Sequence, residues 1–169
     1  MGKTQMEFWD VLDKDRKPTG KKLMRGARMK EDEYHLVVDV WIQSSKGEFL
    51  ISKRTENKTF PNLWETTGGS AVTGDDSLKT ALKEVREELG LELVPVNGKL
   101  IFQCQRSEKQ FPDFLYVWLF KQDFDISSVI CQQDEVSEAK WSTKEQIIQM
   151  IGENIFFQYY NYLKYVFET

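Results

Sequence analysis

Alternating and clustered apolar residues predict six strand regions along the chain. The opening stretch carries Phe8, Val11 and Leu12, continues through a polar turn over 13–20, and returns through Leu23 and Met24. This pattern predicts a β-hairpin at the start of the chain. Runs rich in β-branched and other apolar residues predict five further strands. These cover 35–42, 48–52, 100–105, 114–120 and 139–142.

Apolar residues at helical spacing predict three helices, over 77–89, 143–151 and 155–167. Asp76 suits the N-cap of the first helix, and Gly90 suits its C-terminal end. The order is strands, helix, strands, helices, which favours an α+β fold with helices packed over a mixed sheet. A length of 169 residues without a linker or repeat favours a single domain over 1–169.

The third predicted helix is unusually aromatic. Its aromatic residues are Phe156, Phe157, Tyr159, Tyr160, Tyr162, Tyr165 and Phe167. A helix that is apolar around so much of its circumference needs more than one partner surface. Packing on the sheet is the first expectation, and a subunit interface in a homodimer or a substrate-stacking wall remain alternatives.

Composition and charge argue against several classes of function for this chain. The formal net charge is −4, which disfavours a protein that binds a nucleic-acid polymer along its phosphates. Apolar runs fall short of the roughly 18 residues that span a membrane, so no membrane association is expected. The two cysteines, Cys104 and Cys131, cannot form a disulfide framework, and a cytoplasmic location is therefore expected.

Three glutamates on the helix over 77–89 suggest a metal site. Glu84, Glu87 and Glu88 fall within an arc of about 100°, opposite the apolar stripe of that helix. A glycine-rich loop with Gly68 and Gly69 precedes the helix, where its backbone could approach an ion closely. Oxygen ligands of this kind suit a hard divalent cation. The alternative is a solvated acidic face, because basic side chains on the same helix supply local partners.

The spacing of this segment resembles the Nudix box, G-x5-E-x7-R-E-U-x-E-E-x-G-U, in which U is an apolar residue. The match runs over 69–91 through Gly69, Asp75, Lys83, Glu84, Val85, Glu87, Glu88, Gly90 and Leu91. The resemblance to the MutT-like Nudix hydrolase superfamily implies the Nudix fold, a mixed sheet sandwiched by helices. It also implies a hydrolase that needs Mg²⁺, with Mn²⁺ as a substitute, and that acts on a small-molecule diphosphate substrate.

The resemblance implies roles for individual residues. Glu87 and Glu88 would be the principal Mg²⁺ ligands, Glu84 a ligand or base, and the Gly68 carbonyl a further ligand. Such enzymes usually add a loop carboxylate before the last strand. Glu135 and Glu138 are the candidates, and we favour Glu135, although it could equally be a solvated loop acid.

Two positions depart from the box. Asp75 replaces its first glutamate and Lys83 replaces its arginine. In the family these positions resemble an ion pair that braces the loop against the helix. Opposite charge is kept here, so the pair can still form, but without the bidentate fork of arginine.

The resemblance also extends to isopentenyl-diphosphate isomerase, through the opening 9–20 and the stretch 35–69. That isomerase chemistry needs a cysteine after the Leu63-Trp64 stretch and a cluster of histidines, whereas this chain has no thiol there and His35 is its single histidine. We therefore expect a hydrolase on an isomerase-like scaffold and keep the isomerase as the alternative. A lone histidine at the head of an apolar strand is expected to be structural.

The substrate would be a nucleoside diphosphate linked to another group. Lys53 and Arg54, just before the glycine loop, are placed to hold phosphate, and a guanidinium suits bidentate binding. Phe60 could stack on a base or wall off the pocket. The alternative for both basic residues is an exposed strand end. Water would displace one phosphoryl group, with Glu84 or Glu135 taking its proton.

Overall fold

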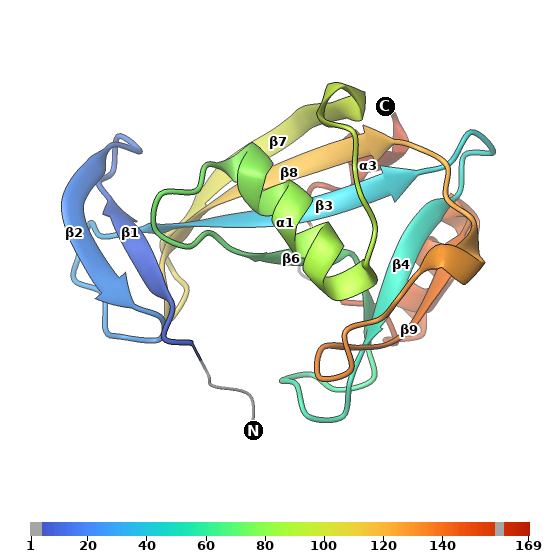
Figure 1. The fold of residues 1–169 in the computed structure, drawn as a ribbon, viewed down its shortest axis with the longest axis horizontal. Coiled ribbons are helices and arrows are strands. Elements are labelled where there is room, and N and C mark those ends of the chain that lie inside the picture. Colours follow the sequence, from blue (N-terminus) through green and yellow to red (C-terminus); the bar gives the residue numbers. More distant parts are fainter. Residues whose placement is uncertain (1–4, 158–160) are drawn as a thin grey trace.

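A mixed sheet of seven strands forms the centre of the molecule (Figure 1). The computed structural model describes residues 5–157 and 161–169. The strands are β3 (His35–Gln43), β4 (Phe49–Arg54), β5 (Trp64–Glu65), β6 (Thr67–Ser70), β7 (Gly98–Arg106), β8 (Asp113–Lys121) and β9 (Val136–Ser142). Their main order is β5-β4-β3-β8-β7, with β6 beside β3 and β9 beside β4. β3 and β8 are parallel and the other pairs are antiparallel, so the sheet is mixed as predicted.

The first two strands form a separate antiparallel hairpin, β1 (Phe8–Leu12) with β2 (Pro18–Met24). It lies at one side of the main sheet in Figure 1. Leu12 and Tyr34 exchange two backbone hydrogen bonds of 2.8 and 3.0 Å. The ring of Trp9 stacks on the ring of His35 with centroids 3.9 Å apart. These contacts hold the hairpin against the start of β3.

One face of the sheet is covered by α1 (Ser77–Leu89), which crosses in front of β3 and β8 in Figure 1. Ala81, Val85 and Leu89 pack on Val38 and Val40 from β3. The Asp76 side chain accepts a hydrogen bond from the Lys79 amide, and Gly90 ends the helix in the left-handed conformation. The helix, its N-cap and its C-terminal glycine are confirmed.

The other face is covered by α2 (Lys144–Gly152) and α3 (Leu163–Phe167). Thr143 caps α2 through a capping box with Gln146. Ile147 and Tyr162 are fully buried in the same apolar cluster as Trp41. Two 3₁₀ turns, Pro95–Asn97 and Ile126–Ser128, complete the elements. The sheet therefore lies between helices, as the predicted fold requires.

The predicted third helix is wrong over its first part. Residues 155–157 are extended beside β5: the Trp64 amide donates to the Ile155 carbonyl, and the Phe157 amide donates to the Trp64 carbonyl. In the part of this segment that the structure describes, helical structure begins at Leu163. Tyr159 and Tyr160 lie outside the described residues. Backbone hydrogen bonds to a distant strand here replace the local bonds of a helix.

The glycine loop and the last strand also differ from expectation. Residues 67–70, expected to be a loop, pair with β3 as β6. The last strand begins at Val136, so Glu138 lies within β9 opposite Lys53 rather than in a loop before it. Both differences arise because a long neighbouring strand offers unpaired backbone groups at these positions.

No helix within the described residues has the length and apolar character needed to cross a membrane. Cys104 and Cys131 are free thiols and are half-buried rather than fully buried. Their pKa values are raised, chiefly by burial, so both are protonated at neutral pH.

Candidate active site

Glu84 lies directly against the glycine loop. A Cβ placed on Gly69 would come within 2.6 Å of both carboxylate oxygens of Glu84. A Cβ on the preceding Gly68 would lie 2.5 Å from the carbonyl oxygen of Val38. The two glycines therefore let β6 pass between α1 and β3 with the Glu84 carboxylate touching its backbone.

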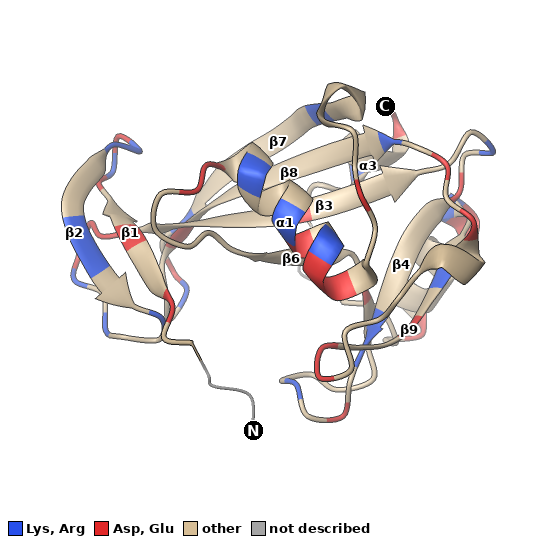
Figure 2. Ribbon diagram, in the orientation of Figure 1, with Lys and Arg blue, Asp and Glu red and all other residues tan. Residues whose placement is uncertain are grey.

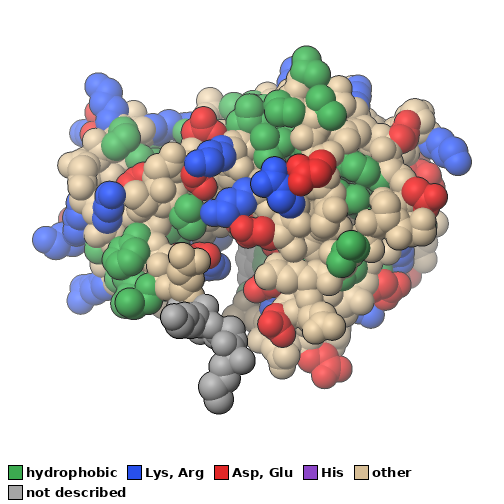
Figure 3. Space-filling model, in the orientation of Figure 1, with side chains coloured by type: hydrophobic (Ala, Val, Ile, Leu, Met, Phe, Trp, Pro, Cys, Tyr) green, Lys and Arg blue, Asp and Glu red, His purple; other side chains and the backbone are tan. Residues whose placement is uncertain are grey.

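The three box glutamates lie in different environments near the C-terminal end of α1. Glu88 is only 6% exposed, Glu84 is half-buried and Glu87 is exposed. Burial, together with the nearby charge of Glu87, raises the pKa of Glu84 to about 7. Burial and the charge of Glu84 raise the pKa of Glu88 well above its usual range. The ribbon in Figure 2 marks acidic residues at this end of α1, and the space-filling view in Figure 3 shows acidic and basic groups side by side in the same region.

This donor set fits a cation chemically. Among the described residues, no hydrogen bond or ion pair engages the carboxylates of Glu84, Glu87 or Glu88. Buried carboxylates without a compensating charge are unfavourable, and a divalent cation would remove that cost. The described part of the chain holds no group of three acidic, histidine or cysteine side chains already converged on one point. Binding would therefore require side-chain rotation or bridging water.

The loop carboxylate Glu135 faces the same region. Its side chain forms an ion pair with Lys58, and its backbone carbonyl accepts a hydrogen bond from the Thr55 amide. The charges of Lys58 and Glu135 both act on the pKa of Glu88, in opposite directions. Glu138 instead acts on Cys131 and lies on β9. The placement of Glu135 near Glu88 supports the preference for Glu135 over Glu138.

The predicted ion pair between Asp75 and Lys83, which links the loop to the helix, also includes Lys79. Lys83 Nζ lies 3.6 Å from Asp75 Oδ2, and Lys79 Nζ lies closer, 2.6 Å from Asp75 Oδ1. The Asp75 side chain is 6% exposed, while both lysines are more open to solvent. Two monodentate lysines here surround the carboxylate that an arginine would hold with one fork.

The guanidinium of Arg54 already has interaction partners within the protein. Its Nη1 donates to Glu65 at 2.7 Å, its Nε donates to the Thr59 carbonyl at 2.8 Å, and its guanidinium lies over the Phe157 ring. A phosphate could bind there only by sharing or displacing these partners. Lys53 lies over the Trp64 ring, and Phe60 is half exposed, with its ring edge-on to Phe157. The substrate-binding roles of these three residues stay predictions.

Two partly buried acids near the site, Glu65 and Asp39, were not anticipated. The pKa of Glu65 is raised by burial although Arg54 opposes the shift, and Glu65 in turn acts on Glu88. Asp39 lies on β3 opposite Gly68 and accepts a hydrogen bond of 2.6 Å from the Tyr162 hydroxyl. Burial raises the pKa of Asp39 to about 6. The sequence did contain a signal for Asp39, because it is a charged residue inside the otherwise apolar run 36–42.

Fold and site together define a carboxylate-rich enzyme site between a glycine strand and an acidic helix, and comparison with known proteins identifies the family. Residues 33–161 match the NUDIX domain family. An uncharacterized Nudix hydrolase of Listeria monocytogenes is 35% identical over 157 residues, which cover 92% of this chain and 90% of the relative. The chain belongs to the Nudix family and is a Nudix hydrolase, an enzyme that acts on diphosphate-containing small molecules.

Solved structures agree on the fold. DR0079 from Deinococcus radiodurans has a TM-score of 0.73 at 19% identity, covering 95% of this chain and 98% of its own. The NUDIX domain of Shewanella oneidensis NrtR, determined with ADP ribose, has a TM-score of 0.61 at 18% identity, covering 80% and 84%. At these identities the likeness concerns the fold alone. The relatives described above do not support the isomerase alternative.

Proposed function

We propose that this chain is a Mg²⁺-dependent hydrolase that cleaves the diphosphate linkage of a nucleoside diphosphate joined to another group. The observation that carries the proposal is the set of three glutamates at one end of α1, without a counter-charge of their own, beside the glycines of β6. Support for the substrate class comes from the family and from the NrtR domain determined with ADP ribose. We place its action in the cytoplasm, which two free thiols favour.

The proposed ligands of the metal are Glu84, Glu87, Glu88 and the Gly68 carbonyl. When bound there, Mg²⁺, or Mn²⁺ in its place, would neutralise phosphate charge and lower the pKa of a bound water. The side chains of this chain supply the remaining roles. Asp75 and Lys83 hold the loop that leads into α1, and this keeps Gly69 against Glu84.

Proton transfer falls to the acids around the glutamate cluster. Glu135 is our preferred base, because its carboxylate pairs with Lys58 and lies close enough to Glu88 for its charge to act on that glutamate. Glu84 is the second candidate. Lys53, Arg54 and Phe60 would contact the substrate at the other side of the loop over 55–62. Of these, Arg54 can do so only if Glu65 shares its guanidinium.

The test is a panel of nucleotide sugars, dinucleoside polyphosphates, NADH, ADP-ribose and isopentenyl diphosphate, each assayed with and without Mg²⁺. We expect cleavage of at least one nucleoside diphosphate compound, dependent on the metal. Glu87→Gln should lower kcat roughly 100-fold or more. Glu92→Gln is the matched control, because Glu92 is exposed and pairs with Arg86, outside the glutamate cluster.

Three results would contradict the proposal. They are no cleavage of any compound, activity in Glu87→Gln equal to that of the unaltered chain, and conversion of isopentenyl diphosphate without hydrolysis. A comparison of Glu135→Gln with Glu138→Gln assigns the loop base, since only the first should lose activity. If Glu138→Gln alone loses activity, the assignment of Glu135 is wrong.

A further inference from the structure

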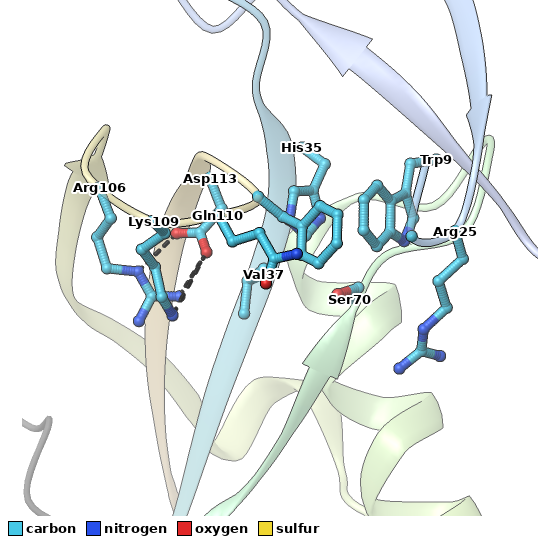
Figure 4. Close-up of a pocket in the computed structure, with 11 residues that line it drawn as sticks. Trp9, Arg25, His35, Val37, Ser70, Arg106, Lys109, Gln110 and Asp113 are labelled. Atoms are coloured by element: carbon cyan, nitrogen blue, oxygen red, sulfur yellow. Dashed lines mark hydrogen bonds and ion pairs between the residues drawn. The ribbon is translucent and has the colours of Figure 1, made fainter. Parts of the chain in front are cut away.

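A cavity of about 470 Å³ lies between the N-terminal hairpin and the main sheet, and none of its residues was implicated from the sequence as a substrate ligand (Figure 4). Trp9 and His35 form one wall, and Val37 and Ser70 lie beneath them. The loop between β7 and β8 closes the other side. Four segments that are distant in the sequence therefore build one cavity.

Two buried nitrogen atoms in this wall have no hydrogen bond. Trp9 is 4% exposed and His35 is 3% exposed, and within the described residues neither Trp9 Nε1 nor His35 Nδ1 has a partner. Buried polar atoms are nearly always satisfied in folded proteins, so orphans that border a cavity indicate a missing ligand or ordered water. An indole nitrogen can only donate, which points to a ligand that carries an acceptor.

The charges around the cavity favour an anion. Three cations line it, Arg25, Arg106 and Lys109, against one carboxylate, Asp113. The Asp113 carboxylate accepts two hydrogen bonds from Arg106, of 2.6 and 2.8 Å, and Lys109 Nζ lies 3.9 Å from Asp113 Oδ2. The side chains of Lys109 and Arg25 are 46% and 58% exposed. Arg25 Nη1 also pairs with Glu7 at 2.7 Å, so a ligand would share the Arg25 guanidinium with Glu7. In a chain of net charge −4, such a concentration of positive charge is local.

A nucleobase is a poorer fit to this cavity. Trp9 and His35 stack directly on one another, 3.9 Å apart and within 10° of parallel, which leaves no slot between the rings. The edge of Phe111 also packs against Trp9, with centroids 5.7 Å apart. The aromatic surfaces are therefore already used, and the groups left for a ligand are the cations and the two orphan nitrogens.

The cavity adjoins the proposed cleavage site. Ser70, which lines it, directly follows Gly69, whose backbone touches the Glu84 carboxylate. Arg25, on the opposite side from Lys109 in Figure 4, is close enough for its charge to act on Glu84. A diphosphate at the glutamates would thus extend naturally toward the cavity.

We propose that this cavity binds a further anionic group of the substrate, a phosphate or carboxylate carried by the part of the molecule beyond the cleaved diphosphate. This inference rests on the proposed function and narrows its substrate class. Lys109 would bind the anion directly, Arg25 would do so while sharing its guanidinium with Glu7, and Trp9 Nε1 would act as a neutral donor. Arg106 would hold Asp113 so that its carboxylate does not repel the ligand.

The experiment uses pairs of compounds that differ by one anionic group. NADPH against NADH tests a phosphate, and UDP-glucuronate against UDP-glucose tests a carboxylate. The ratio of kcat/KM within each pair is measured with Mg²⁺ for the unaltered chain, Lys109→Met and Arg25→Met. Lys99→Met is the matched control, because Lys99 is an exposed lysine on β7 outside the cavity.

We expect the anionic member of at least one pair to be preferred about 10-fold, mainly through a lower KM. Lys109→Met and Arg25→Met should bring that ratio toward one, and Lys99→Met should leave it unchanged. The pair that shows the preference identifies phosphate or carboxylate as the bound group. No preference in either pair, or a preference that survives both cavity variants, would overturn the inference.

A binding measurement separates this inference from the proposed function. The same four compounds are titrated calorimetrically into the protein in EDTA. EDTA removes divalent metal, so the titration measures binding without metal-dependent hydrolysis. If no compound is cleaved, yet an anionic member binds about 10-fold tighter and Lys109→Met removes the difference, the cavity assignment holds while the hydrolase proposal fails. If cleavage occurs with no anionic preference in either assay, only the cavity assignment fails.

Discussion

At the scale of single residues, the contact between Gly69 and Glu84 is the tightest constraint on the proposed site. The carboxylate occupies the space in which any larger residue at position 69 would place its Cβ. The glycine is therefore needed for the position of a carboxylate rather than for backbone freedom alone.

Gly69→Ala should push the Glu84 carboxylate away from β6 and lower kcat/KM by roughly 10- to 100-fold. The folded structure should survive, since only a side-chain end must move. Gly152→Ala is the control, because nothing lies within 4 Å of a Cβ at that position. Steady-state kinetics on the best substrate measure the effect. Equal kinetics for Gly69→Ala and the unaltered chain would show that the close approach has no catalytic value.

His35 makes a second prediction at this scale, which concerns acid stability. Burial lowers the pKa of His35 to about 4, and Arg106, Lys109 and Arg25 add to the shift. Between pH 6.5 and 4 the unfolded chain binds a proton at this position and the folded chain does not. The contribution of His35 to stability is therefore complete above pH 6.5 and falls by about 3 kcal/mol as the pH drops to 4.

Urea unfolding at several pH values tests this against His35→Gln. The unaltered chain should lose stability relative to the variant as the pH falls through this window. Asp39→Asn serves as the comparison of opposite sign. The raised pKa of Asp39 means that its contribution is present at low pH and is lost as the pH rises from about 4 to 6. A difference between His35→Gln and the unaltered chain that does not vary with pH would contradict the assignment.

At the scale of elements, local information decides which parts of the fold can be predicted from sequence. α1 was predictable from end to end, because its periodicity, the Asp76 cap and Gly90 are all within its own residues. β6 was not, since a Thr-Gly-Gly-Ser sequence has no strand pattern and becomes a strand only beside β3. Residues 155–157 likewise depend on Trp64, far away in sequence. The box glutamates were predictable by spacing, whereas the Trp9, His35 and Lys109 cavity exists only after folding.

Tyr162, the residue just before the short helix α3, contacts the centre of the sheet through its hydroxyl. The Tyr162 hydroxyl donates to Asp39 and accepts from Trp41 Nε1 at 3.2 Å. Tyr162→Phe removes a donor from a buried carboxylate and should lower the free energy of unfolding by about 1–3 kcal/mol. Tyr165→Phe within α3 is the control, since Tyr165 is exposed and its variant should change the free energy of unfolding by less than about 0.5 kcal/mol. Equal stability of the two variants in urea would contradict a role for this network.

At the scale of the whole molecule, we propose that residues 1–169 act as one domain although the family match begins at residue 33. The hairpin β1–β2 shares two backbone hydrogen bonds and the Trp9–His35 stack with the main sheet. In addition, the Gly74 amide donates to Asp10, which joins the hairpin to the loop that leads into α1. Through these contacts the hairpin is attached both to β3 and to the loop that precedes α1.

A single domain should unfold in one cooperative step. Urea transitions followed by tryptophan fluorescence and by far-UV circular dichroism should coincide. Amide hydrogen exchange in 8–12 should become fast at the same denaturant concentration as exchange in 36–42. Earlier loss of protection in the hairpin alone would show that it is an independent unit.

The parallel pairing of β3 with β8 has a consequence for folding during synthesis on the ribosome. Residues 35–43 lie in register with 113–121, and everything between them, including α1 and the glycine strand, is made before their partner exists. During synthesis the edge of β3 that pairs with β8 stays unpaired until the second half of the chain is made. The nascent chain therefore carries a complete set of box glutamates before β8 can complete the sheet, and we expect the unpaired edge of β3 to be prone to aggregation in that interval.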